Sequence, residues 1–189
     1  MVYTDYKIAA ERHLEVCLQL LDIIEDEYQK KEPLSRAKEK EKNQLLADLY
    51  YLSGYIIECS YNCAIYKAVG WLTNDVKRLE TTSTRHSVSC FNPRVGSSSS
   101  FTIRKNSNHS FSGNTHFFQT IIATSAISHL PVIGTNLLPS HSAYELFDNW
   151  NAEIRYQVDS NITLDYNSTF AFFYLANEIY EGLLTNSMI

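Results

Sequence analysis

The feature that most constrains the fold is the apolar pattern of residues 45–66. Large apolar side chains recur there at alternating steps of four and three residues. The series is Leu45, Leu49, Leu52, Ile56, Cys59, Cys63 and Tyr66. This is the period of an α-helix packed nearly parallel or antiparallel to another helix, and no β-strand has it. The small residues Ser53, Gly54 and Ser60 would let a neighbour approach closely.

A first helix is predicted from about Thr4 to Gln29, because Thr4 can cap its start and Pro33 ends the run. Its expected apolar stripe is Leu14, Cys17, Leu18, Leu21 and Tyr28, widened by Val16, Leu20 and Ile23. We therefore expect much of this helix to be buried.

The second helix is predicted over about 35–69, with a polar start, SRAKEKEKNQ, that projects into solvent. A third helix is predicted at about 115–130. A fourth begins at SAYE, read as a capping box of Ser142 and Glu145. Its expected apolar face is Leu146, Phe147, Trp150 and Ile154. A fifth helix begins near Asn167 and is rich in aromatic side chains.

Residues 71–114 are dominated by serine, threonine, asparagine and glycine. They predict an irregular insertion with a short hairpin around Ser100 to Arg104. The sequence as a whole thus predicts one all-α domain over residues 1–189. We expect an up-down helical bundle of about five helices, with the loop-rich insertion between the second and third.

The net charge of −5 argues against a general nucleic-acid coat, which needs a basic surface. Residues 70–116 nevertheless hold six basic residues against two acidic ones, a local charge of +4 in a chain whose remainder is −9. Either a basic patch or a solvated loop would explain this. The charged N-terminus and the lack of a long apolar run predict a cytoplasmic protein with no membrane contact.

One face of the second helix is polar and aromatic. Tyr51, Tyr55, Glu58 and Asn62 follow each other at i, i+4, i+7 and i+11, offset from the apolar seam. A carboxylate at this position needs hydrogen bonds or a cation. Two interpretations stay open: a structural network that fixes the helix register, or a polar binding groove at the bundle surface.

The fourth helix is expected to align Asp148, Asn151 and Arg155, with Tyr156 next to them. Arg155 is the only basic residue after Lys105, so an internal salt bridge to Asp148 or Glu58 is one interpretation. A contact to an anion or a phosphate group is the other.

Arg104 and His109, in RKNSNH, form an R-x4-H pair. Histidine can move a proton of a ribose hydroxyl while arginine stabilises charge on phosphate, so such a pair can cleave RNA without a metal. A chance match is the alternative. No metal-ligand spacing and no phosphate-binding loop appears, so neither a metal nor another cofactor is expected.

Several stretches resemble the HEPN superfamily of small prokaryotic helical domains. AAERHLEVCLQLLD is similar to the first helix of that family, and LADLYYLSGYIIECSYNCAIYK to the second. HFFQTI followed by LPVIG fits the third helix and its exit loop, and WNAEIRYQ fits the W-x(4)-R-Y segment of some members. The resemblance covers most of the chain except residues 71–114. It implies an antiparallel hairpin of the first two helices, with Glu58 near the fourth helix as a partner for Arg155.

The resemblance also implies functions. Many HEPN proteins are metal-independent endoribonucleases of toxin–antitoxin or phage-defence systems, often homodimers with an R-x(4–6)-H motif at the dimer interface. Some pair with a nucleotidyltransferase antitoxin, and others serve as binding or assembly modules. Here the late helix has Arg155 and Tyr156 but no histidine at the right spacing downstream.

We therefore expect a module that binds a nucleotide, RNA or a partner protein through Tyr51, Tyr55, Glu58, Arg155 and Tyr156. It would act as a homodimer, with a nucleotidyltransferase-type antitoxin or a defence-complex subunit as a further partner. The first alternative is a ribonuclease that uses Arg104 and His109 at a dimer interface. A purely structural helical subunit of a larger complex is the second.

Overall fold

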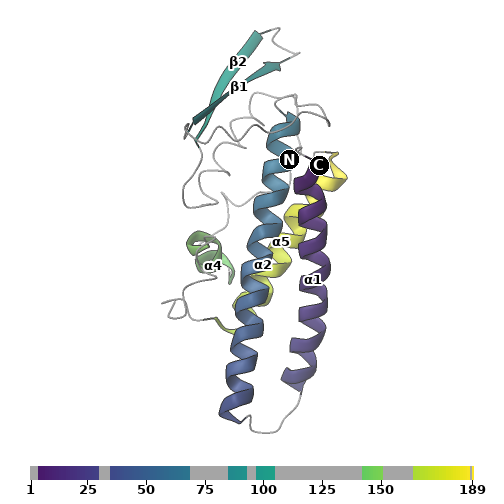
Figure 1. Ribbon diagram of the computed structural model, residues 1–189, viewed down its shortest axis with the longest axis vertical. Helices are drawn as coiled ribbons and strands as arrows, with labels where there is room; N and C mark the ends of the chain where they lie inside the picture. Colours follow the sequence, from purple (N-terminus) through teal and green to yellow (C-terminus); the bar gives the residue numbers. More distant parts are fainter. Residues whose placement is uncertain are drawn as a thin grey trace.

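The computed structural model describes residues 4–29, 35–68, 85–92, 97–104, 142–150, 164–187 and 189. Its helices are α1 (Thr4–Gln29), α2 (Arg36–Ala68), α4 (Tyr144–Asn149) and α5 (Tyr166–Thr185). Strands β1 (Arg85–Asn92) and β2 (Ser97–Arg104) pair as an antiparallel hairpin (Figure 1). The described part of the chain is mainly helical, in agreement with the predicted all-α class.

Helices α1 and α2 form a long antiparallel hairpin (Figure 1). Cys17 Sγ lies 3.9 Å from Ser53 Oγ, and the ring of His13 lies beside that of Tyr55, so residues pair in opposite directions along the two helices. The predicted bounds of both helices are confirmed to within about a residue. The polar start of α2 is exposed, as predicted.

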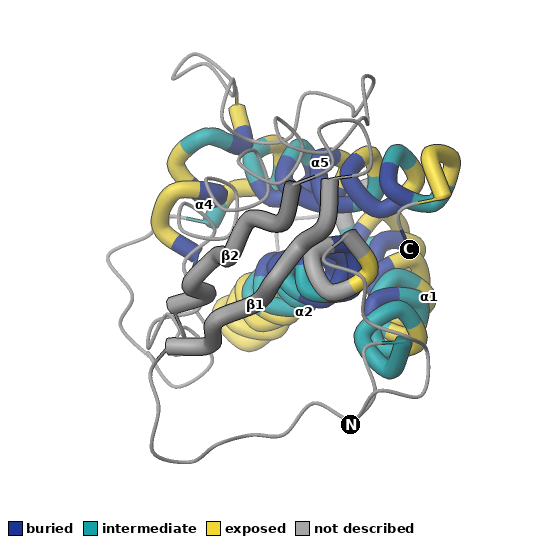
Figure 2. Tube along the Cα trace, turned by 90° about the horizontal axis from the view of Figure 1, so that it is seen from above, coloured by how far each residue is buried: buried dark blue, intermediate teal, exposed yellow. Residues whose placement is uncertain are grey.

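Helix α5 covers one side of this hairpin (Figure 2). It runs in the same direction as α2: Phe172 packs edge-on against Tyr50 at 5.0 Å, and further along Tyr180 donates a hydrogen bond of 3.1 Å to Glu11 of α1. The start of α5 is fixed by Asp165, whose side chain accepts from the backbone N–H of Ser168 at 3.0 Å. The buried core lies where α5 meets the hairpin.

The prediction that much of α1 is buried is wrong. Its fully buried positions are Ala10, Cys17 and Ile24, with Leu21 nearly so. The apolar side chains exposed on it are Ile8, Val16, Leu18 and Ile23. The reason is packing geometry: α2 and α5 cover α1 from one side only, so the stripe that they bury is narrower than the apolar surface of the helix.

The fourth helix is shorter than predicted. Its N-cap is Ala143, which makes no side-chain capping bond, so the expected capping box of Ser142 and Glu145 is wrong. The helix ends at Asn149, because Trp150 is extended (φ −66°, ψ 132°). Trp150 therefore cannot continue a helical face toward Ile154. Its indole instead packs on Gly54 of α2, where an added Cβ would overlap the ring.

Strand β2 includes the predicted hairpin segment, and its partner β1 begins at Arg85. The register places Arg85 opposite Arg104, and Val88 opposite Phe101. The predicted helix at 115–130 and the remainder of the insertion lie outside the described residues, so the predicted number of helices stays a prediction. None of the described helices combines the length and apolar character needed to cross a bilayer.

Candidate functional site: a tyrosine groove between α1 and α2

Two tyrosines stand one helical turn apart on α2. The hydroxyl of Tyr51 lies 3.3 Å from that of Tyr55, and the two rings meet edge-on at 4.9 Å between centroids. Both side chains are half-buried, as is Glu58 on the next turn. Tyr51, Tyr55 and Glu58 therefore share a partly exposed face of α2, on which the two tyrosine hydroxyls are adjacent to each other.

His13 of α1 joins this face, which sequence reasoning missed. Its ring centroid lies 5.5 Å from that of Tyr55. Burial lowers the pKa of His13, so its imidazole is neutral near pH 7. The signal was present in the sequence: two antiparallel helices joined by a short connection place a residue early in the first opposite one late in the second. His13 then falls opposite the middle of α2.

Trp150 contacts the same tyrosine from the other side. Its ring meets that of Tyr55 at 5.3 Å and 88°, a T-shaped contact. Trp150 is 2% exposed and follows directly after α4, which is held to α2 by a 2.7 Å hydrogen bond from the Tyr50 hydroxyl to the Leu146 carbonyl. Tyr55 thus stands between a fixed indole and the imidazole of His13.

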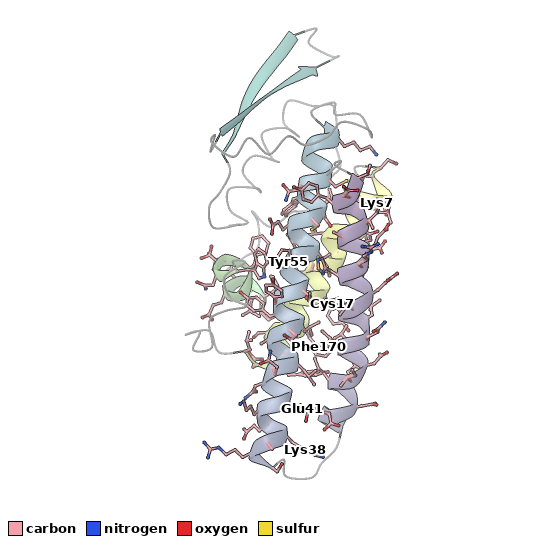
Figure 3. All side chains as sticks on the ribbon, in the orientation of Figure 1. Lys7, Cys17, Lys38, Glu41, Tyr55 and Phe170 are labelled. Carbon is pink, nitrogen blue, oxygen red and sulfur yellow. The ribbon has the colours of Figure 1, made fainter. Side chains whose placement is uncertain are left out.

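His13, Tyr51 and Tyr55 border a hollow of about 430 Å³ between α1 and α2. It is lined by His13, Val16 and Leu20 of α1 and by Asp48, Tyr51, Leu52 and Tyr55 of α2. We call it the tyrosine groove. Figure 3 shows Tyr55 on α2 and, nearer the joined end of the two helices, Lys38 and Glu41. The groove is mostly apolar, with hydroxyl and imidazole groups at one end and one carboxylate on its wall.

Burial keeps the titratable groups at the tyrosine end of the groove in their neutral forms. Burial raises the pKa of Tyr55 well above its usual range, and the hydrogen bond with Tyr51 and the nearby Glu58 carboxylate add to the shift. The phenol therefore stays protonated and acts as a hydrogen-bonding group. A neutral imidazole and protonated phenols can donate hydrogen bonds to a ligand and accept them from it.

The buried thiols are not reactive. Burial raises the pKa of Cys17 and of Cys59 to about 12 each, and that of Cys63 to about 11. All three are free and buried. Because the thiolate is the nucleophile and the metal ligand, these cysteines are packing residues. Within the described ranges, no group of three or more His, Cys, Asp or Glu side chains could hold a metal ion.

The sequence-predicted site residues fall into three groups. Tyr51, Tyr55 and Glu58 are described and share one side of α2. Arg104 ends β2 opposite Arg85. The others, His109, Arg155 and Tyr156, lie outside the described residues, so the pairing of Arg104 with His109 and that of Glu58 with Arg155 stay predictions.

Comparison with known proteins gives no family for this chain. No protein-family model matches it, and no curated protein and no solved structure is significantly similar to it.

Proposed function

We propose that this chain is a HEPN-like helical binding module of a prokaryotic toxin–antitoxin or phage-defence type of system, active in the cytoplasm and not a standard catalyst. The order of its helical motifs supports the family, and the tyrosine groove is the contact surface. One observation carries this function: His13, Tyr51 and Tyr55 come from two helices to line a single half-open groove.

Of the three ligand classes, a partner protein fits this groove best. A nucleotide or RNA brings phosphate charge, which proteins meet with arginine, lysine or clustered backbone N–H groups. None of the described residues that line the tyrosine groove is a lysine or arginine, and Asp48 would repel a phosphate. Tyrosine is instead one of the residues enriched in the protein contacts that concentrate binding energy.

A capture experiment tests this function. Wild-type protein, Tyr51→Ala and Tyr174→Ala are used as bait in a lysate of the source cells, and captured proteins are identified by mass spectrometry. Tyr174 is a matched control, since it is a tyrosine on α5 that is 55% exposed and lines no part of the groove. We expect a protein that is retained by wild type and Tyr174→Ala and lost with Tyr51→Ala. Equal retention by all three baits would contradict a role for the groove.

A ribonuclease remains the second candidate, for one specific reason. The strand register sets Arg85 directly opposite Arg104, so two basic residues stand at the same end of the β1–β2 hairpin. This supports a phosphate contact for Arg104. The test is RNA cleavage in EDTA by wild type and His109→Ala, with circular dichroism to show that both are folded. Cleavage that survives chelation and is lost in His109→Ala would favour this candidate over the binding module.

A further inference from the structure

A second hollow continues the tyrosine groove toward the joined ends of α1 and α2. It measures about 100 Å³ and is lined by Ile23 and Glu27 of α1 and by Lys38, Glu41, Lys42 and Leu45 of α2. The next lining residues along each helix, Leu20 and Asp48, already belong to the tyrosine groove. We call the two hollows together the hairpin groove.

A row of the residues that line the hairpin groove has heptad spacing on each helix, and on α2 Lys42 and Tyr51 lie beside that row. On α1 the steps are three, four, three and four, through His13, Val16, Leu20, Ile23 and Glu27. On α2 they alternate in the same way, through Lys38, Glu41, Leu45, Asp48, Leu52 and Tyr55. Such a spacing keeps a row of side chains facing one neighbouring helix along its whole length. Each helix therefore turns a second seam toward the same outer side of the hairpin.

This outer side differs from the core-forming side in exposure. Val16 is 42% and Ile23 49% exposed, although both stand in the heptad row. The row is about 21 Å long from His13 to Glu27, because an α-helix rises about 1.5 Å for each residue along the chain. Two antiparallel helices with paired exposed seams form the slot that a third helix occupies in a bundle, and here the slot is about four turns long.

Charge selects the kind of helix. The charged residues that line the two hollows are Glu27, Glu41 and Asp48 against Lys38 and Lys42, a net charge of −1, and the helices that carry them add a longer-range field. Helix α1 has seven acidic residues and two basic ones, a net charge of −5. Helix α2 has five basic residues and four acidic ones, a net charge of +1. The two helices together are therefore at −4, and Lys30, Lys31 and Glu32 in their connection bring residues 4–68 to −3. At the tyrosine end the only lining residue with a full charge is Asp48, because burial keeps His13 neutral near pH 7. A helix with lysine or arginine beside its apolar stripe complements this field.

We infer that the hairpin groove binds a basic amphipathic α-helix of a partner protein, about four turns long. Its apolar residues would repeat at i, i+3, i+4 and i+7 and would pack on Val16, Leu20, Ile23, Leu45 and Leu52. This inference rests on the proposed binding function of the tyrosine groove and extends it to the shape and charge of the ligand.

The probe for this inference is a labelled synthetic helical peptide of about 18 residues, with leucine at the heptad positions and lysine at most others. We expect saturable one-to-one binding to the full chain, measured by fluorescence anisotropy. A scrambled peptide of the same composition controls for net charge. Its dissociation constant should be at least about tenfold higher. A peptide with glutamate in place of lysine should also bind about tenfold more weakly at low salt.

Two variants of α1 locate the binding surface. Ile23→Glu places a carboxylate in the hairpin groove, and Leu18→Glu places one on the same helix away from both hollows. The two native side chains are equally exposed, at 49% and 50%, and the change in charge is the same. We expect the dissociation constant for the peptide to rise about tenfold or more in Ile23→Glu and to change less than about twofold in Leu18→Glu.

Each of the following results would overturn the inference. The two variants, or the ordered and scrambled peptides, could bind alike. Ile23→Glu could lower the melting temperature far more than Leu18→Glu, which would show an occupant within the chain. Sedimentation could show a wild-type dimer that Ile23→Glu alone dissociates, which would make a second copy the occupant. If a captured protein depends on Tyr51 but the peptide does not displace it, the proposed function survives and only the helical ligand fails.

Discussion

Two neighbouring residues of α1 show how differently the two sides of the hairpin are used. Ile24 is fully buried against the core that α2 and α5 build, whereas Ile23 is 49% exposed and lines the hairpin groove. The side chains are chemically identical, and the apolar stripe expected from the sequence included Ile23 but not Ile24. What separates them is the position of α5, which covers one side of the hairpin (Figure 2). Apolar character therefore identifies packing surfaces without distinguishing the core from a binding site.

The largest expected effect is on the covered side. Replacing Ile24 by Ala removes a buried side chain and leaves a cavity, so the free energy of unfolding should fall by about 2–5 kcal/mol. Urea denaturation followed by far-UV circular dichroism measures this. A loss below about 0.5 kcal/mol would mean that this side of α1 is not the core.

The contact between α2 and Trp150 should show the next largest effect. Gly54→Ala places a methyl group where the indole lies, and overpacking of this kind costs about 1–3 kcal/mol, partly offset by the better helix propensity of alanine. Denaturation of a double-mutant cycle checks the cause. In a Trp150→Ala background the same substitution should be neutral or stabilising, and an unchanged cost there would rule out the steric explanation.

Removing the N-cap of α5 should destabilise this helix, which covers only one side of the α1–α2 hairpin. Asp165→Ala leaves the backbone N–H of Ser168 without its 3.0 Å acceptor, for an expected loss of about 1 kcal/mol in the free energy of unfolding. Asp165→Ser keeps a capping oxygen and is the matched control. An equal loss in both variants, measured by thermal denaturation, would show that the cap does not stabilise α5.

The pH dependence of stability tests the burial of His13. Because burial lowers its pKa in the folded state, the unfolded chain binds more protons on acidification, and stability falls as the pH drops below about 6.5. In His13→Gln this part of the loss between about pH 7.5 and 5.5 should disappear. Asp165 affects stability at lower pH than His13 does. Its hydrogen bonds to Ser168 lower its pKa, so its contribution to the free energy of unfolding is lost only as the carboxylate is protonated. Parallel pH profiles for wild type and His13→Gln would contradict the burial.

The smallest expected effect is on the open side. Ile23→Ala should change the free energy of unfolding by less than about 0.5 kcal/mol, since half of the side chain is already in water. The measurement is the same urea denaturation as for Ile24→Ala. A loss comparable to that of Ile24→Ala would remove the contrast between the two sides.

Local sequence patterns accounted for much of the helical framework. The bounds of α1 and α2 follow from their apolar period, their polar ends and the proline after α1. The start of α5 near Asn167 was also predicted, and Asp165 explains it. The start of α4 was predicted to within about a residue, but its capping was not, because a serine and a glutamate three residues apart form a capping box only when the backbone places the serine at the N-cap. Here Ala143 has that place.

Of the candidate site, the sequence by itself determined that Tyr51, Tyr55 and Glu58 share a side of α2, since helical spacing alone fixes this. Only the tertiary structure decided that His13 and Trp150 meet Tyr55, because those contacts depend on how distant segments pack. It also decided which apolar seam of α1 is buried. A helix encodes an apolar surface through its own period, whereas burial depends on which elements cover that surface, and that choice is made by the packing of the whole domain.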